Sequence, residues 1–176
     1  MLNIRLNDPA LDALGPAGPL AAAMPVARLA PGLREIIAEG IVLTGEVITL
    51  GDIPAWAGQP PGRYADLTAW EGFVSGFHLE DHLPIEVGSS PDGAPVISEA
   101  DQVLMLRHGL GFALEIARTA PVPIRCVVAT NSTNGTFRFH RARPGESWLG
   151  ADLDSYRGDK AIVVDRGPAT LGGTPW

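Results

Sequence analysis

The strongest constraint on the fold is a pair of strand-like segments that together span residues 124–142. Both segments are rich in β-branched and aromatic residues, and the polar stretch Asn131-Ser-Thr-Asn-Gly135 between them has turn chemistry. Two prolines stand just before the first segment and would end a preceding helix. The pattern predicts an antiparallel β-hairpin over residues 124–142.

Two segments carry helical periodicity. Residues 66–83 space their apolar side chains as a helix does, with Asp66 as the predicted N-cap. Residues 99–118 follow Ser98, which with Asp101 resembles a capping box. The second helix would contain two glycines in one turn, each costing about 1 kcal/mol relative to alanine. We therefore expect this helix either to pack closely on a neighbour or to kink.

Strands and helices do not alternate regularly along the chain, which favours a single α+β domain over a doubly wound sheet. We expect a mainly antiparallel sheet that contains the hairpin and a strand near 161–165, covered by the two helices. A length of 176 residues suits one domain. The remaining predictions are a strand over Leu2–Leu6, an irregular segment over residues 8–32 with one helical turn near Leu20–Met24, a short helix at 33–39, a hairpin or one bulged strand at 41–50, and a C-terminal tail at 166–176.

Charge is segregated along the sequence. Eight acidic residues and no lysine or arginine lie between Tyr64 and Leu106, whereas five arginines and no acidic residue lie between Ile116 and Gly145. The net charge of −7 argues against nucleic acid as the main partner, because phosphate binding needs a basic surface. A lone cysteine and the lack of a signal peptide or a long apolar run predict a cytoplasmic protein without a membrane span.

Most acidic runs are solvated helix faces, and three of the eight acids are explained as helix caps or first-turn charges. The unexplained acids form the candidate partner-binding set: Glu71, Glu80, Asp81, Glu86 and Asp92. Exposed together, they would steer a basic protein onto the chain. The leading hypothesis is therefore a non-enzymatic bacterial protein that neutralises a basic partner such as a toxin, as immunity proteins and inhibitors do.

The alternative is a small enzyme, and the first candidate site combines Cys126 with His140. If Thr130 pairs with Thr136, these two residues face each other with Cβ atoms about 4.5–5.5 Å apart, and Arg138 on the same face would favour a thiolate. A two-residue loop would instead bring Cys126 opposite Arg143. A lone cysteine is more often a small buried apolar residue.

The second candidate site is a zinc site formed by His78 and His82. On the predicted helix over residues 66–83, side chains four residues apart share a face, so both imidazoles could bind one Zn²⁺. The zincin pattern requires glutamate directly after the first histidine, and Leu79 occupies that position. The simpler interpretation is a solvated helix end.

Overall fold

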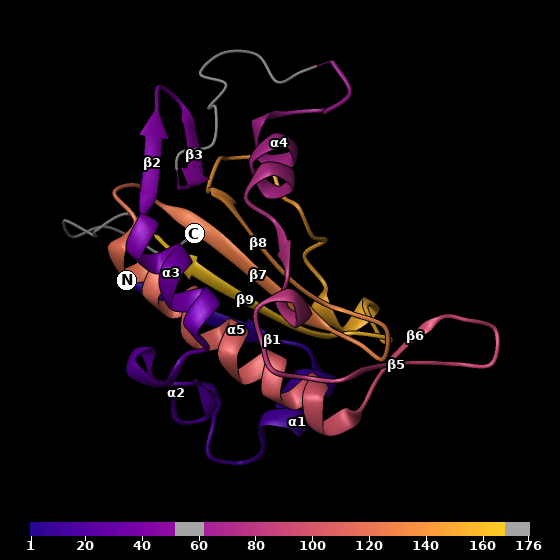
Figure 1. Cartoon of the computed structure of the whole chain (residues 1–176). Coiled ribbons are helices and arrows are strands. Elements are labelled where there is room, and N and C mark those ends of the chain that lie inside the picture. The colour runs from indigo at the N-terminus through magenta and orange to yellow at the C-terminus, as the bar shows by residue number, and fades with distance from the viewer. Residues whose placement is uncertain (52–61, 168–176) are drawn as a thin grey trace.

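A mainly antiparallel sheet forms the centre of this α+β domain, seen in the computed structural model in Figure 1. The structure describes residues 1–51 and 62–167. In these residues the strands are β1 (Leu2–Leu6), β2 (Ile41–Thr44), β3 (Val47–Leu50), β4 (Phe77–His78), β5 (Val87–Ser89), β6 (Pro95–Ile97), β7 (Ile124–Thr130), β8 (Gly135–Arg141) and β9 (Lys160–Arg166). The helices are α1 (Asp8–Leu14), α2 (Pro19–Ala22), α3 (Pro31–Glu39), α4 (Leu67–Val74) and α5 (Glu99–Thr119), with single 3₁₀ turns at Val26–Arg28, Leu79–Asp81 and Leu153–Ser155.

The main sheet has the strand order β1-β9-β7-β8-β4, and every neighbouring pair is antiparallel. The predicted hairpin is therefore confirmed as β7–β8, and the strands predicted at 2–6 and 161–165 are its companions β1 and β9. The hairpin register differs from the one that would pair Thr130 with Thr136, because Thr130 pairs with Gly135. That shift of one residue decides which side chains share a face.

Helix α5 covers one face of the sheet, and its packing explains its two glycines (Figure 1). A Cβ atom on Gly109 would lie 2.6 Å from a methyl carbon of Val128, and one on Gly111 would clash with the backbone of Met24. Ser98 caps the helix through Asp101 as predicted. Of the two explanations for the glycines, the structure confirms close packing.

The segment over residues 8–32 contains more helix than the single turn predicted near Leu20–Met24: α2 lies close to that turn, but α1 was not expected. Asn7 is fully buried, and its side-chain oxygen accepts hydrogen bonds from the backbone of Ala10 at 3.1 Å and of Ala161 at 2.9 Å. It thus caps α1 and ties that helix to β9. Frequent alanine, proline and glycine hide the short helices α1 and α2, because proline is well tolerated in a first helical turn. The short helix predicted at 33–39 is confirmed as α3.

The prediction of a helix over residues 66–83 is half right. Asp66 is the N-cap, but α4 ends at Val74, and the chain continues as β4, which pairs with β8. A Cβ atom on Gly76 would lie 2.7 Å from the carbonyl oxygen of Gly72, so the chain turns there with the help of a glycine. The helix therefore stops well before His78.

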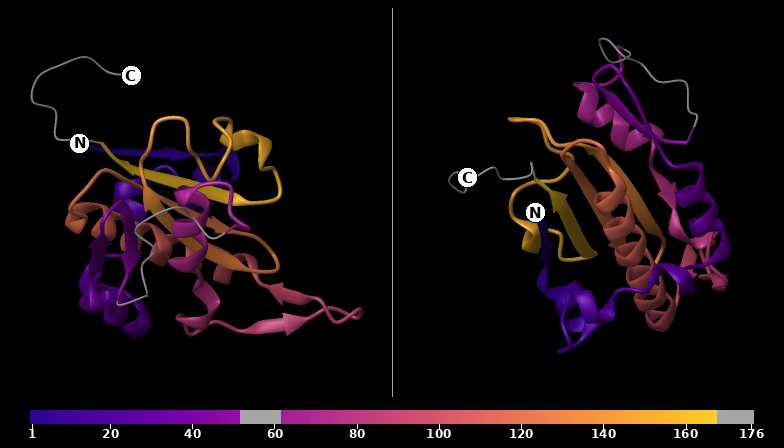
Figure 2. Two further views of the ribbon diagram at one scale, coloured as in Figure 1. Left: turned by 90° about the horizontal axis from the view of Figure 1, so that it is seen from above. Right: turned by 90° about the vertical axis from the view of Figure 1, so that its left-hand side faces the viewer.

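The two smaller sheets are hairpins. β2 pairs with β3, so residues 41–50 form a hairpin rather than one bulged strand. β5 pairs with β6, a strand that the sequence pattern did not reveal. This second hairpin projects from the body of the protein, as Figures 1 and 2 show. The tail predicted at 166–176 lies outside the described residues, apart from its first two, of which Arg166 ends β9.

Among the described helices, none combines the length with the apolar character that a transmembrane span requires.

Candidate functional site

The structure separates Cys126 from His140. Cys126 pairs with Phe139 and lies on the sheet face that packs against α5, whereas His140 pairs with Arg125 and lies on the opposite face. Arg138 pairs with Val127 and also points away from Cys126. The expected thiol–imidazole pair is therefore wrong, and the cause is the one-residue difference in register.

Cys126 is a buried apolar side chain. It is 1% exposed, its Sγ lies 3.8 Å from the carbonyl oxygen of Ala113 on α5, and burial raises the pKa of the thiol far above its ordinary value. A nucleophilic cysteine needs a depressed pKa and access to solvent, and this residue has neither.

His140 is 1% exposed. Its Nδ1 lies 2.8 Å from the carbonyl oxygen of Arg141. A carbonyl can only accept, so Nδ1 carries the proton and Nε2 carries the lone pair. Burial lowers the pKa of the ring, and Nε2 has no hydrogen-bond partner among the described residues. The imidazole is thus a buried acceptor beside Arg125.

The arrangement expected for zinc is not formed by His78 and His82. They do not share a helix: His78 ends β4, and the 3₁₀ turn Leu79–Asp81 separates it from His82. Nδ1 of His78 lies 3.0 Å from a carboxylate oxygen of Glu80, while the ring of His82 packs edge-on against Phe77. In residues 1–51 and 62–167, no group of three His, Cys, Asp or Glu side chains is placed to hold a metal ion.

Glu71 is the centre of a buried ion pair, contrary to the expectation that it is exposed. Its side chain is 0% exposed and accepts hydrogen bonds from both terminal nitrogens of Arg143, at 2.8 Å from Nη1 and 2.7 Å from Nη2. It also accepts the backbone N–H groups of Ile48 at 2.9 Å and Arg141 at 2.8 Å. One carboxylate therefore joins α4 to β3 and to the end of β8, and it is not available to a partner.

Glu80 also has a mainly internal role. One carboxylate oxygen accepts the backbone N–H of Gly135 at 2.9 Å, where β8 begins, and its side chain is 15% exposed. Glu80 therefore fixes the 3₁₀ turn Leu79–Asp81 against the β7–β8 turn. Its carboxylate is used mainly in this contact within the fold rather than in attracting a partner.

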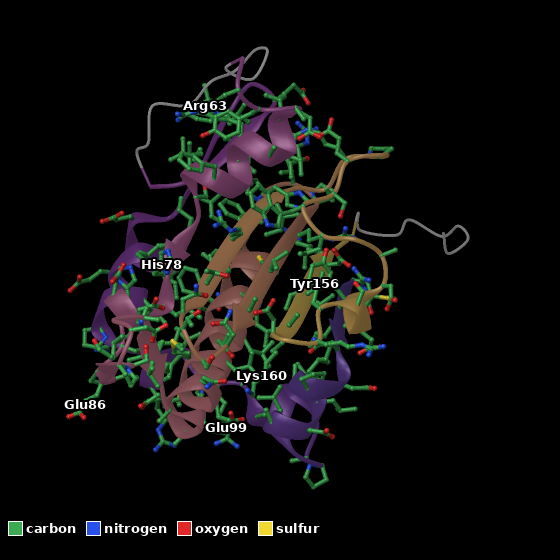
Figure 3. All side chains as sticks on the ribbon, turned by 90° about the vertical axis from the view of Figure 1, so that its right-hand side faces the viewer. Arg63, His78, Glu86, Glu99, Tyr156 and Lys160 are labelled. Atoms are coloured by element: carbon green, nitrogen blue, oxygen red, sulfur yellow. The ribbon has the colours of Figure 1, made fainter. Side chains whose placement is uncertain are left out.

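The other three acids of the candidate set, Asp81, Glu86 and Asp92, are exposed. Glu86 and Asp92 belong to the segment 86–97, which we call the arm and which contains β5 and β6. Figure 3 shows Glu86 at the same end of the molecule as Glu99, in the first turn of α5. Glu86 and Glu99 thus lie at one end of the molecule, whereas Glu71 is buried elsewhere.

The arm also presents apolar surface that the sequence reading missed. Val87 is 49% exposed and Val96 is 43% exposed. At the base of the arm, Ile97 is buried, and its N–H donates to the carbonyl of Ser132 at 2.8 Å. The β-branched residues Val96 and Ile97, which follow the turn residues Ser90-Pro-Asp-Gly93, are the signal that could have revealed β6.

Arginines on the sheet face away from α5 were missed as well. Arg5 and Arg125 come from distant parts of the sequence, and antiparallel pairing brings both beside β9. Only the strand order could have shown that they are close, and a single sequence does not give that order.

The comparisons with known proteins place the chain in a family. A family model described as "Uncharacterized protein PM0498 family" matches residues 20–170, which include the arm, α5 and most of the sheet. No curated protein and no solved structure matches the chain. Since the matched region is well over half of its length, the chain belongs to the Uncharacterized protein PM0498 family.

Proposed function

We propose that this chain is a bacterial protein-binding protein, of the immunity or inhibitor kind, that holds a basic partner on its arm. The observation that carries the proposal is the arm itself, in which every residue from 86 to 96 except Ser90 is exposed. Its two strands pair only with each other in the described residues. A lone two-stranded hairpin is marginally stable in water, so a ribbon of this kind is better suited to docking than to supporting the fold.

The arm combines two chemical features that a protein interface uses. Val87 and Val96, each nearly half exposed, offer apolar area whose burial contributes about 1 kcal/mol per side chain. Glu86 and Asp92 give the arm a negative charge with no lysine or arginine between residues 84 and 98. This charge raises the association rate with a basic protein more than the final affinity.

The short strands of the arm offer a third feature. β5 and β6 have only each other as neighbouring strands among the described residues, so β5 has an outer edge of backbone N–H and C=O groups, whereas on β6 Pro95 has no N–H and Ile97 donates its own to Ser132. A partner can add a strand to such an edge, with backbone hydrogen bonds for affinity and the valines for specificity. This mode keeps the core of the protein unchanged during binding.

A capture experiment with matched charge variants tests the proposal. The variant Glu86→Lys/Asp92→Lys changes the arm, and Asp12→Lys/Glu35→Lys makes the same change in net charge at exposed acids of α1 and α3. We expect a basic protein from the source organism to be retained by the wild type and by the control, and lost with the arm variant. Equal capture by both variants, or capture of an acidic partner, would contradict the proposal.

Neutralisation is tested separately on the captured partner. If the partner is a toxin, its expression alone should stop growth, and co-expression of this chain should restore it. The arm variant should fail to restore growth, while the control variant should succeed. A partner that is harmless alone would leave binding intact as a function and would remove the immunity interpretation.

A further inference from the structure

A pocket of about 240 Å³ lies on the sheet face away from α5, far from the arm in sequence. Its floor is formed by Arg5 of β1, Val163 of β9 and Arg125 of β7. The loop that follows β8 forms its wall, with Ser147 and the small residues Gly150 and Ala151. The small wall residues leave the pocket open to solvent.

Charge in the pocket is not balanced. Arg125 donates to Asp165 from Nε at 2.6 Å and from Nη2 at 3.4 Å, and Nε of Arg5 lies 3.7 Å from the same carboxylate. In the described part of the chain, neither arginine forms an ion pair with another acid. Two guanidinium groups therefore share one carboxylate, and one positive charge remains.

The hydrogen-bond donors divide unequally between the two arginines. Nη1 of Arg125 donates to the hydroxyl of Ser147 at 3.0 Å, so all three nitrogens of this guanidinium have a partner and the group is held in place. The two Nη groups of Arg5 donate to no group in residues 1–51 or 62–167, and its side chain is 35% exposed. A planar guanidinium with its outer donors free is the usual receptor for a carboxylate or phosphate group.

We propose that this pocket binds a small oxyanion, a carboxylate or a phosphate, through the Nη groups of Arg5. Arg125 adds positive charge behind the ligand, and Asp165 holds both guanidinium groups in position. The site lies outside the arm, so ligand binding here is a separate activity from the capture of a protein partner.

Titration of the full-length chain with sodium phosphate, and separately with sodium acetate, tests the site. We expect saturable shifts of the backbone amide resonances of Gly150 and Ala151, and competition between the two anions at the same amides. The anion with the tighter affinity identifies the preferred group. A uniform shift of exposed amides over the whole surface, or no saturation with either anion, would overturn the proposal.

Variants that are expected to lower, raise or leave unchanged the affinity for the anion distinguish binding at this site from general charge screening. Loss of a charge-assisted contact in Arg5→Gln should weaken binding about tenfold, while Arg107→Gln, an exposed arginine on α5, should leave it unchanged. Asp165→Asn keeps the shape of the side chain and removes the competing negative charge, so the affinity should rise.

Ala151→Leu should block binding without any change in charge. Equal losses in Arg5→Gln and Arg107→Gln would overturn the proposal, as would a lower affinity in a folded Asp165→Asn variant.

Discussion

Glu71 and Glu86 belong to the same acidic block of the sequence, yet they occupy opposite environments. Glu71 is fully buried and receives four hydrogen bonds from Arg143, Arg141 and Ile48. Glu86 is exposed on the arm, at an end of the molecule that Figure 3 shows well away from α4. The same residue type therefore holds the fold together at one position and shapes the surface at the other.

The difference shows that a charge block divides according to which strands lie near each acid. The arginine-rich hairpin ends beside α4, so it neutralises Glu71 through Arg143. The arm lies beyond the sheet, and its acids have no arginine or lysine within ion-pair distance among the described residues. The binding hypothesis consequently depends on the outer acids alone.

The largest expected effect comes from the buried member of the comparison. Glu71→Ala should lower the free energy of unfolding by about 3–5 kcal/mol, because it leaves Arg143 and two backbone N–H groups without their acceptor in a buried place. Urea denaturation followed by circular dichroism measures this loss.

A double variant tests whether the loss of stability comes from the unpaired charge of Arg143. Replacing both partners, in Glu71→Leu/Arg143→Met, should restore part of the stability, since no unpaired charge then remains. A loss below about 1 kcal/mol in Glu71→Ala would contradict the interpretation of Glu71 as a buried anchor, because exposed ion pairs have that value.

The next effect is a pH dependence from the same buried region. Burial lowers the pKa of His140, and the charges of Arg125 and Arg143 act in the same direction, whereas the hydrogen bond to the carbonyl of Arg141 and the charge of Glu71 raise this pKa. As the pH falls through the ordinary value of about 6.5, the unfolded chain takes up a proton that the folded chain does not. Stability should therefore be complete above this pH and decrease below it.

Denaturation between about pH 7.5 and 5.5 measures this dependence. The variant His140→Phe should reduce its slope without abolishing it, because burial also lowers the pKa of His108. An unchanged slope in the variant would show that His140 becomes protonated in the folded protein.

Much of the fold was predictable because it is local. Asp66 and Ser98 are N-cap residues that predict the starts of α4 and α5, and strand propensity with turn residues predicts the β7–β8 hairpin. The candidate site was less predictable because it depends on register and on distant contacts. A four-residue loop, instead of five, moved Cys126 to the core face, and the contact between Glu71 and Arg143 joins residues far apart in sequence.

A smaller loss is expected at Glu80, which lies between the two extremes of exposure. Glu80→Ala removes the acceptor for the N–H of Gly135 and should cost about 1–2 kcal/mol. Its neighbour Asp81 is exposed, so Asp81→Ala is the matched control and should change stability little. Equal unfolding midpoints for the two variants would contradict a structural role of Glu80.

The smallest effect on stability is expected at the arm. Glu86→Lys/Asp92→Lys should change the free energy of unfolding by no more than about 0.5 kcal/mol, because both side chains are exposed and the hydrogen bond that Asp92 accepts from Ser90 is itself exposed. Thermal and urea denaturation of this variant and of Asp12→Lys/Glu35→Lys should therefore give the same result. A loss as large as that of Glu80→Ala would show that the arm acids support the fold. The contrast between Glu71 and Glu86 would then be one of degree, and a loss of partner capture in the arm variant could no longer be assigned to the interface.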